Sequence, residues 1–140
     1  MDYEKILFDR AASTLKVHGI LSIIFGGIGI LAASLFTLLL MLAGATDIPI
    51  DEELGYSIGA SFLALLVFVF WTLPHAYLIV SGSYLIRKSP PKLVKTLVII
   101  NLVIGVFWNV AFLILSIINL TELDAYERGY HVHRKHAHKS

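Results

Sequence analysis

The feature that most constrains this chain is an uncharged run of 26 residues, Thr96 to Thr121, in its C-terminal half. A helix of that length reaches about 39 Å, whereas the hydrocarbon core of a bilayer is about 30 Å thick. The run therefore crosses a membrane once as a tilted helix, or it folds into two shorter helices. This choice decides the number of spans and the side of the membrane on which the C-terminus lies.

The composition indicates an integral membrane protein located in the cell membrane. Hydrophobic residues make up 57% of the 140 residues, charged residues make up 15%, and the charges cluster between long uncharged runs. A soluble domain of this size has too little interior to bury so much apolar surface. The net charge of +1 gives no general attraction to nucleic acid. The sequence has no cysteine, which excludes disulfides and thiolate chemistry.

We expect an all-α integral membrane protein, a small bundle of four transmembrane helices with the last two as a tight hairpin. An amphipathic interfacial helix is predicted over residues 1–16, a transmembrane domain over 17–127 and a basic, histidine-rich tail over 128–140. The spans are expected at about 18–43, 56–86, 90–107 and 109–126. The alternative is a protein of three spans with one long last helix.

The distribution of charge favours four spans. Residues 87–95 carry four positive charges, whereas the loop over 44–56 carries four acids and no Lys or Arg. Positive-inside reasoning places the basic loop in the cytoplasm together with both termini, which requires an even number of spans. A turn at Trp108–Asn109 meets this requirement and puts the tryptophan at an interface. Asn101 and Asn119 then lie at mid-depth on adjacent helices, where we expect them to bond to each other.

Small residues at helical spacing predict close helix packing. Such residues allow two backbones to approach, either within one chain or between copies. The predicted packing residues are Ser22, Gly26, Gly29 and Ala33 on the first span and Gly55 and Gly59 on the second.

Four polar residues within the predicted spans are candidates for function. His75 lies beside Pro74 deep in the second span, where an ionisable side chain marks a functional site by default. The alternative is a neutral histidine that donates to a carbonyl freed by the proline. Together with Asn101, Asn109 and Asn119, His75 would line the polar path of a small transporter or channel.

The C-terminal tail is the other candidate for chemistry. Four imidazoles in a short segment chelate Zn, Ni or Cu. The competing interpretation is a basic tail that contacts anionic lipid through Arg134, Lys135 and Lys139. The candidate metal ligands are His131, His133, His136 and His138.

Four features lie between Ser81 and Leu123: Gly82 near the end of a span, Arg87–Lys88, Asn101–Leu102 and a turn at Phe107–Asn109. With these features the segment resembles a group of small uncharacterised bacterial membrane proteins with four hydrophobic segments. The turn usually contains Pro and Gly in that group, and this chain has neither. The resemblance implies four spans and supplies no catalytic or binding residue.

The sequence favours a protein that is not an enzyme. It contains no nucleophile–base constellation, no phosphate-binding glycine loop and no cofactor motif. We expect an accessory subunit of a membrane complex or a homo-oligomer, whose partners are the lipid bilayer and other membrane proteins or itself. A small transporter or channel and a metal-handling protein are the alternatives.

Overall fold

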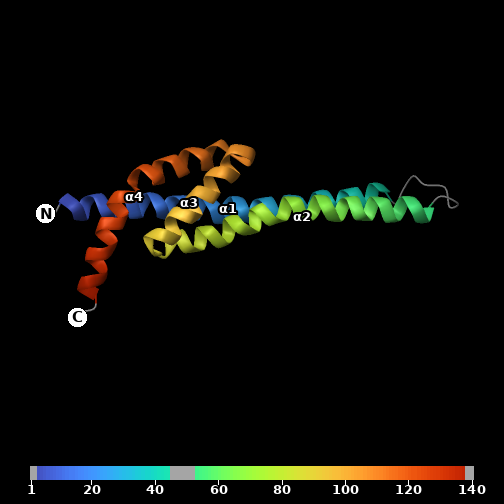
Figure 1. The fold of residues 1–140 in the computed structure, drawn as a ribbon. Coiled ribbons are helices and arrows are strands. Elements are labelled where there is room, and N and C mark those ends of the chain that lie inside the picture. The colour runs from blue at the N-terminus through green and yellow to red at the C-terminus, as the bar shows by residue number, and fades with distance from the viewer. Residues whose placement is uncertain (1–2, 45–52, 138–140) are drawn as a thin grey trace. The chain divides into compact units, whose positions relative to one another are not determined.

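The computed structural model describes residues 3–44 and 53–137, and these residues form an all-α protein, as expected. Two stretches, Tyr3–Leu42 and Ser61–Ile86, are long and apolar enough to cross a membrane, by length and composition. Four helices follow one another along the chain: α1 (Tyr3–Gly44), α2 (Glu53–Ile86), α3 (Pro91–Trp108) and α4 (Val110–Ala137) (Figure 1).

The chain divides into two compact units. Unit 1 contains Met1–Ile23 and Leu78–Ser140, which include the start of α1, the end of α2 and all of α3 and α4. Unit 2 contains Ile24–Tyr77, which include the rest of α1 and α2. Each unit has its own buried residues, and each is described separately.

The first and last helices, α1 and α4, extend beyond the predicted spans. α1 is one helix from Tyr3, so the segment predicted as a separate interfacial helix is its first part. Its apolar residues Phe8, Ala11 and Leu15 are buried at the 3–4 spacing of a single helix face, which explains why the helix does not break before the first span. α4 continues to Ala137 into the segment predicted as a tail. Most of the predicted acidic loop, residues 45–52, lies outside the described residues.

The 26-residue apolar run forms two packed helices that are separated at Asn109. Asn109 has extended backbone angles, and its N–H donates to the carbonyl of Gly105 at 3.1 Å. Its side-chain oxygen accepts from the N–H of Ala111 at 2.9 Å, so Asn109 is the N-cap of α4. A Cβ on Gly105 would lie 2.5 Å from the backbone nitrogen of Leu113. The turn therefore depends on an N-cap asparagine and a glycine, without proline.

The connection between α2 and α3 is short and bonded to α4. Lys88 follows the end of α2 with a positive φ of 50°, the left-handed conformation that often ends a helix. Ser89 donates from Oγ to the carbonyl of Tyr84 at 2.6 Å, and its own carbonyl accepts from the hydroxyl of Tyr126 at 2.8 Å. Pro91 then begins α3 with a backbone angle suited to the first turn of a helix.

In unit 1, α1 and α4 run antiparallel along a buried seam. Phe8 stacks on Tyr126 with ring centroids 5.5 Å apart, and Arg10 pairs with Glu122 at 3.0 Å. The buried positions alternate at spacings of three and four, which keeps one face of each helix turned inward. The buried residues are Phe8, Ala11, Leu15, His18 and Ser22 on α1 and Phe112, Ser116, Asn119, Leu123 and Tyr126 on α4.

Glycines bring α1 and α2 close together within unit 1. A Cβ on Gly19 would lie 2.6 Å from the carbonyl oxygen of Gly82, and a Cβ on Gly82 would collide with the carbonyl of Gly19. Because backbone atoms are on both sides of this contact, neither helix can accommodate a larger residue by a side-chain rotation. The contact therefore fixes the approach of the two helices next to His18.

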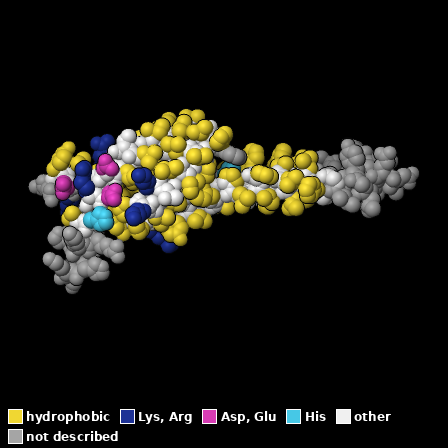
Figure 2. All heavy atoms as spheres, in the orientation of Figure 1, with side chains coloured by type: hydrophobic (Ala, Val, Ile, Leu, Met, Phe, Trp, Pro, Cys, Tyr) yellow, Lys and Arg dark blue, Asp and Glu magenta, His cyan; other side chains and the backbone are white. Residues whose placement is uncertain are grey.

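Unit 2 consists of the remaining parts of α1 and α2. Its buried residues, among those whose surroundings are described, are all small: Gly26, Gly29, Ala33 and Ala64. Large apolar side chains such as Leu31, Leu39, Phe62 and Phe70 are exposed. Figure 2 shows hydrophobic side chains over the described part of these helices on the visible face.

Candidate functional site

The most distinctive site in the described part of the chain is a buried polar centre around His18 in unit 1. His18 has 0% exposure, and both ring nitrogens face asparagine amides. Nδ1 lies 2.6 Å from Nδ2 of Asn119 on α4, and Nε2 lies 3.3 Å from Nδ2 of Asn101 on α3. The three side chains come from three helices and hold them together at one level.

A fourth helix joins the centre through Ser81 on α2. The Ser81 hydroxyl lies 3.2 Å from the side-chain amide of Asn101 and 3.2 Å from the carbonyl of Leu78. Ser81 and Asn101 both have 0% exposure. All four helices therefore contribute to one hydrogen-bonded group. The group fixes the register of the helices, because a shift of any one of them would break a buried bond.

The donors and acceptors of this group constrain each other. A neutral imidazole has one N–H and one bare nitrogen, so it cannot accept from amide N–H groups at both positions. The oxygen and nitrogen of an asparagine amide exchange places by a half-turn, and the partners decide the orientation. One of Asn101 and Asn119 must therefore present its oxygen to the ring of His18.

The neighbours of the centre are apolar on one side and charged on the other. The ring of Phe112 lies 5.8 Å from that of His18, between centroids. Further along the same seam, Arg10 and Glu122 form the ion pair described above, with side-chain exposures of 75% and 17%. The centre itself consists of neutral groups, so the geometry suits hydrogen bonding and offers no carboxylate for acid–base chemistry.

His75 has a different environment in unit 2. Its Nδ1 lies 2.6 Å from the carbonyl of Trp71, one turn earlier in α2, and its ring stacks on Trp71 with centroids 6.2 Å apart. Pro74 frees the carbonyl of Phe70, which is the partner that the sequence predicts for His75. The histidine bonds instead to the next carbonyl along the chain, that of Trp71. A Cβ on Gly29 of α1 would collide with the His75 ring. His75 therefore packs against α1 and bonds to its own helix.

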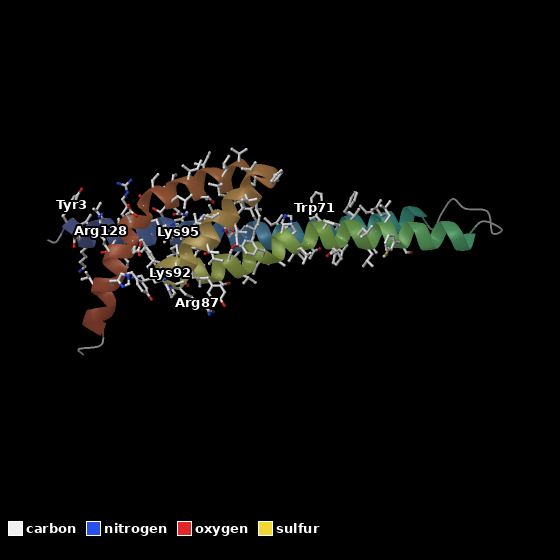
Figure 3. All side chains as sticks on the ribbon, in the orientation of Figure 1. Tyr3, Trp71, Arg87, Lys92, Lys95 and Arg128 are labelled. Atoms are coloured by element: carbon white, nitrogen blue, oxygen red, sulfur yellow. The ribbon has the colours of Figure 1, made fainter. Side chains whose placement is uncertain are left out.

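Unit 2 also contains an apolar cavity of about 440 Å³. Its walls come from α1 and α2, and Trp71, which Figure 3 labels on α2, forms one of them. The lining residues are Ala32, Ala33, Phe36, Val67 and Trp71.

The predicted packing residues on α1 are all buried. Ser22 faces α2 in unit 1, because a Cβ on Gly82 would lie 3.1 Å from that of Ser22. Gly26, Gly29 and Ala33 are buried within unit 2. On α2, a Cβ on Gly59 would meet nothing within 4 Å, and the surroundings of Gly55 lie outside the described residues.

The predicted polar residues do not form a single path within a unit. Asn101 and Asn119 both contact His18 in unit 1, so the histidine lies between the two amides that were expected to bond to each other. Asn109 caps α4, and His75 belongs to unit 2. The polar centre therefore contains two of the four residues.

The tail histidines are only partly described. His131 is exposed on α4, and its ring meets that of Tyr130 edge to face. His133 and His136 lie in the same helix with side chains outside the described set, and His138 lies outside the described residues. Among the residues that were described, no group of three His, Cys, Asp or Glu side chains is placed to hold a metal ion.

Sequence reasoning missed His18, Ser81 and Ser116. The signal for His18 was present: the predicted face of Ser22, Gly26, Gly29 and Ala33 extends backward by one turn to His18. It was placed at the edge of a span because α1 was expected to enter the membrane there. Ser81 and Ser116 carry no comparable signal, because serine is common on every face of an apolar helix.

A comparison with protein-family models finds no family that matches this chain. Comparisons with curated proteins and with solved structures find no match either.

Proposed function

We propose that this chain is a multi-pass integral membrane protein that acts as a non-enzymatic accessory subunit, associating through unit 2 with another membrane protein or with a second copy of itself. The observation that carries the proposal is the kind of residue that unit 2 buries. Its described buried residues are glycine and alanine, so its large apolar side chains face outward. Lipid and a partner helix are the surroundings that suit such a surface.

The burial of the two longest apolar helices supports a membrane location. Only 17% of the most apolar window of α1 and 11% of that of α2 are buried, whereas a core helix of a soluble protein would be mostly buried. Basic residues Arg87, Lys92, Lys95 and Arg128 belong to unit 1 and lie away from the turn between α3 and α4 (Figure 3). We propose that this end of unit 1 faces the cytoplasm, together with both termini.

Membrane residence is tested by alkaline extraction of cell membranes. We expect the full chain to remain in the pellet and to be released only by detergent. Release into the supernatant at high pH would contradict the membrane part of the proposal and leave the subunit part without its basis.

Association is tested by native mass spectrometry of the protein in mild detergent. We expect a homo-oligomer or a complex with a co-purified membrane protein. The variant Ala32→Leu adds bulk at the apolar cavity of unit 2 and is expected to weaken association several-fold. Ala111→Leu on α4 makes the same change at an exposed position of unit 1 and serves as the control. A strict monomer without a partner would contradict the proposal.

Transport is a second candidate, and the contact of His18 with Asn101 and Asn119 favours it, because a polar group at membrane depth can bind a small solute. Flux of small solutes into proteoliposomes measures this activity. We expect His18→Leu to abolish any flux that the wild type supports, and His75→Leu to leave it unchanged. Equal flux in the wild type and His18→Leu would exclude the polar centre as the path.

A further inference from the structure

We infer that the polar centre of unit 1 contains a binding site for a neutral, water-sized ligand, held by Ser22, Ser116 and Asn119 beside His18. The site goes beyond the proposed function, because it depends on the interior of unit 1 and on no partner. Three observations and the donor–acceptor balance support it: these side chains are buried with unpartnered polar atoms, two other helix serines are bonded differently, and the helical register places the three residues close together.

The first observation is that three fully or almost fully buried polar atoms in this group have no hydrogen-bond partner. They are the hydroxyl oxygens of Ser22 and Ser116 and the side-chain oxygen of Asn119. The exposures of these residues are 0%, 0% and 2%. Leaving a buried polar group unpaired costs about 1–3 kcal/mol, and buried water characteristically bonds to such groups.

The second observation concerns how two other helix serines, Ser34 and Ser83, are bonded. Ser34 and Ser83 each donate to the carbonyl four residues earlier in their own helix, at 2.9 Å. This back-bonding is the usual solution for serine within a helix. The hydroxyls of Ser22 and Ser116 make no such bond and are therefore available to another group.

The third observation is the register of the three residues around His18. Ser22 follows His18 by one turn of α1, and Ser116 precedes Asn119 by one turn of α4. Since α1 and α4 run antiparallel and Asn119 contacts His18, Ser22 and Ser116 lie about one turn from that contact, in the same direction along the seam. Ser22 also lies beside Gly82 of α2. The three unpartnered atoms therefore lie within about one helical turn of one another along the seam.

The donor and acceptor balance defines the ligand. If Asn101 turns its oxygen to His18, Asn119 retains a free acceptor; if Asn119 turns instead, it retains free N–H donors. Each serine offers one donor and an acceptor. A ligand that both donates and accepts serves either state, and the neutral lining gives an ion no counter-charge. Water fits this balance, with about three bonds to the protein.

The experiment is water-edited solid-state NMR of the isotope-labelled full chain in lipid bilayers. Magnetisation is transferred from water protons, and its arrival at the side-chain amide of Asn119 and the ring of His18 is followed. We expect transfer at both, although both side chains are almost fully buried. In Ser22→Ala/Ser116→Ala we expect loss of that transfer, with the other resonances unchanged.

Ser83→Ala is the matched control, because it removes a serine of unit 1 whose hydroxyl is already bonded to its own helix. It should leave the transfer unchanged. Absence of transfer to Asn119 and His18 in the wild type would overturn the inference without any variant. Equal transfer in the double variant would overturn it too. If the double variant does not fold, the single variants Ser22→Ala and Ser116→Ala decide, and each must reduce the transfer.

Discussion

His18 of unit 1 and His75 of unit 2 both lie within apolar stretches of helix, yet their side chains make different kinds of contact. His18 has both ring nitrogens beside amides from other helices, with bonded groups on all four helices of its unit. His75 bonds to a carbonyl of its own helix and stacks on Trp71. Unit 1 uses a histidine to connect helices, whereas unit 2 uses one within α2 and against the adjacent face of α1.

The difference extends to what each unit buries. Unit 1 buries Tyr126, Phe112 and His18, which are large and make specific contacts. Unit 2 buries glycine and alanine among its described residues, and at Gly29 the α1 backbone lies against the ring of His75. Directional bonds specify a single register, whereas small-residue packing tolerates sliding and leaves the large side chains outside. We expect unit 1 to be stable by itself and unit 2 to depend more strongly on what surrounds it.

The strongest test of this contrast changes a glycine in unit 1. We expect Gly19→Leu to destabilise the protein by about 3 kcal/mol, because its Cβ would lie 2.6 Å from the backbone oxygen of Gly82, which cannot move alone. The free energy of unfolding is measured by denaturant titration in detergent micelles. Gly27→Leu in unit 2 is the control, since a Cβ there meets nothing within 4 Å. Similar stability of the two variants would show that the close approach of α1 and α2 is not essential.

The second test compares the two histidines directly. We expect His18→Leu to reduce the free energy of unfolding by about 2 kcal/mol, because it leaves the amides of Asn101 and Asn119 buried without their partner. For His75→Leu we expect less than about 0.5 kcal/mol, as for a residue that bonds only within its own helix. The measurement is the same titration. Equal losses would contradict the assignment of the cross-helix role to His18 alone.

Much of the fold follows from local physics, and so it was predictable. The uncharged run exceeds the length that one span needs, and the charges at its ends favour a turn near Trp108–Asn109; the structure has that turn and four helices. The small-residue face of α1 followed from helical spacing. The N-cap role of Asn109 replaced the proline that a turn usually has, which sequence reasoning did not anticipate.

The candidate site was less predictable, because it depends on which helices meet. The sequence predicts Asn101 and Asn119 close together on adjacent helices. Both amides contact one histidine, and that histidine comes from α1. A sequence gives the face of each helix and leaves open which third helix packs on a hairpin. His75 stands out in the sequence because it lies deep within a predicted span, whereas His18 is distinguished by the asparagines that pack against it.

A third test has a smaller expected effect and concerns the loop between α2 and α3 in unit 1. Tyr126 donates from its hydroxyl to the carbonyl of Ser89 at 2.8 Å, connecting α4 to the loop between α2 and α3. We expect Tyr126→Phe to lower the free energy of unfolding by about 1 kcal/mol, since it removes one buried hydrogen bond and keeps the ring against Phe8. Tyr130→Phe is the control for loss of a hydroxyl elsewhere on α4. If it lowered the free energy of unfolding equally, the effect would come from loss of any tyrosine hydroxyl on this helix and not from the bond to Ser89.

The last test changes no residue and decides the direction of the hydrogen bonds in the polar centre. The ¹⁵N chemical shifts of His18 show which ring nitrogen carries the proton. We expect the Nε2–H tautomer, because a turned Asn101 then accepts from the ring and donates to Ser81, whose own proton goes to the carbonyl of Leu78 at 3.2 Å. In this arrangement Ser81 donates one hydrogen bond and accepts another. If Asn101 were not turned, the single proton of Ser81 would have to serve two acceptors, the carbonyl of Leu78 and Oδ1 of Asn101. An Nδ1–H tautomer would show that Asn119 has turned, and the free group beside Ser116 would then be a donor.

His75 provides the reference within the same spectrum: its Nδ1 faces the carbonyl of Trp71, an acceptor only, so that nitrogen must carry the proton. Opposite tautomers for the two histidines would thus express the contrast between a ring bonded across helices and a ring bonded within one.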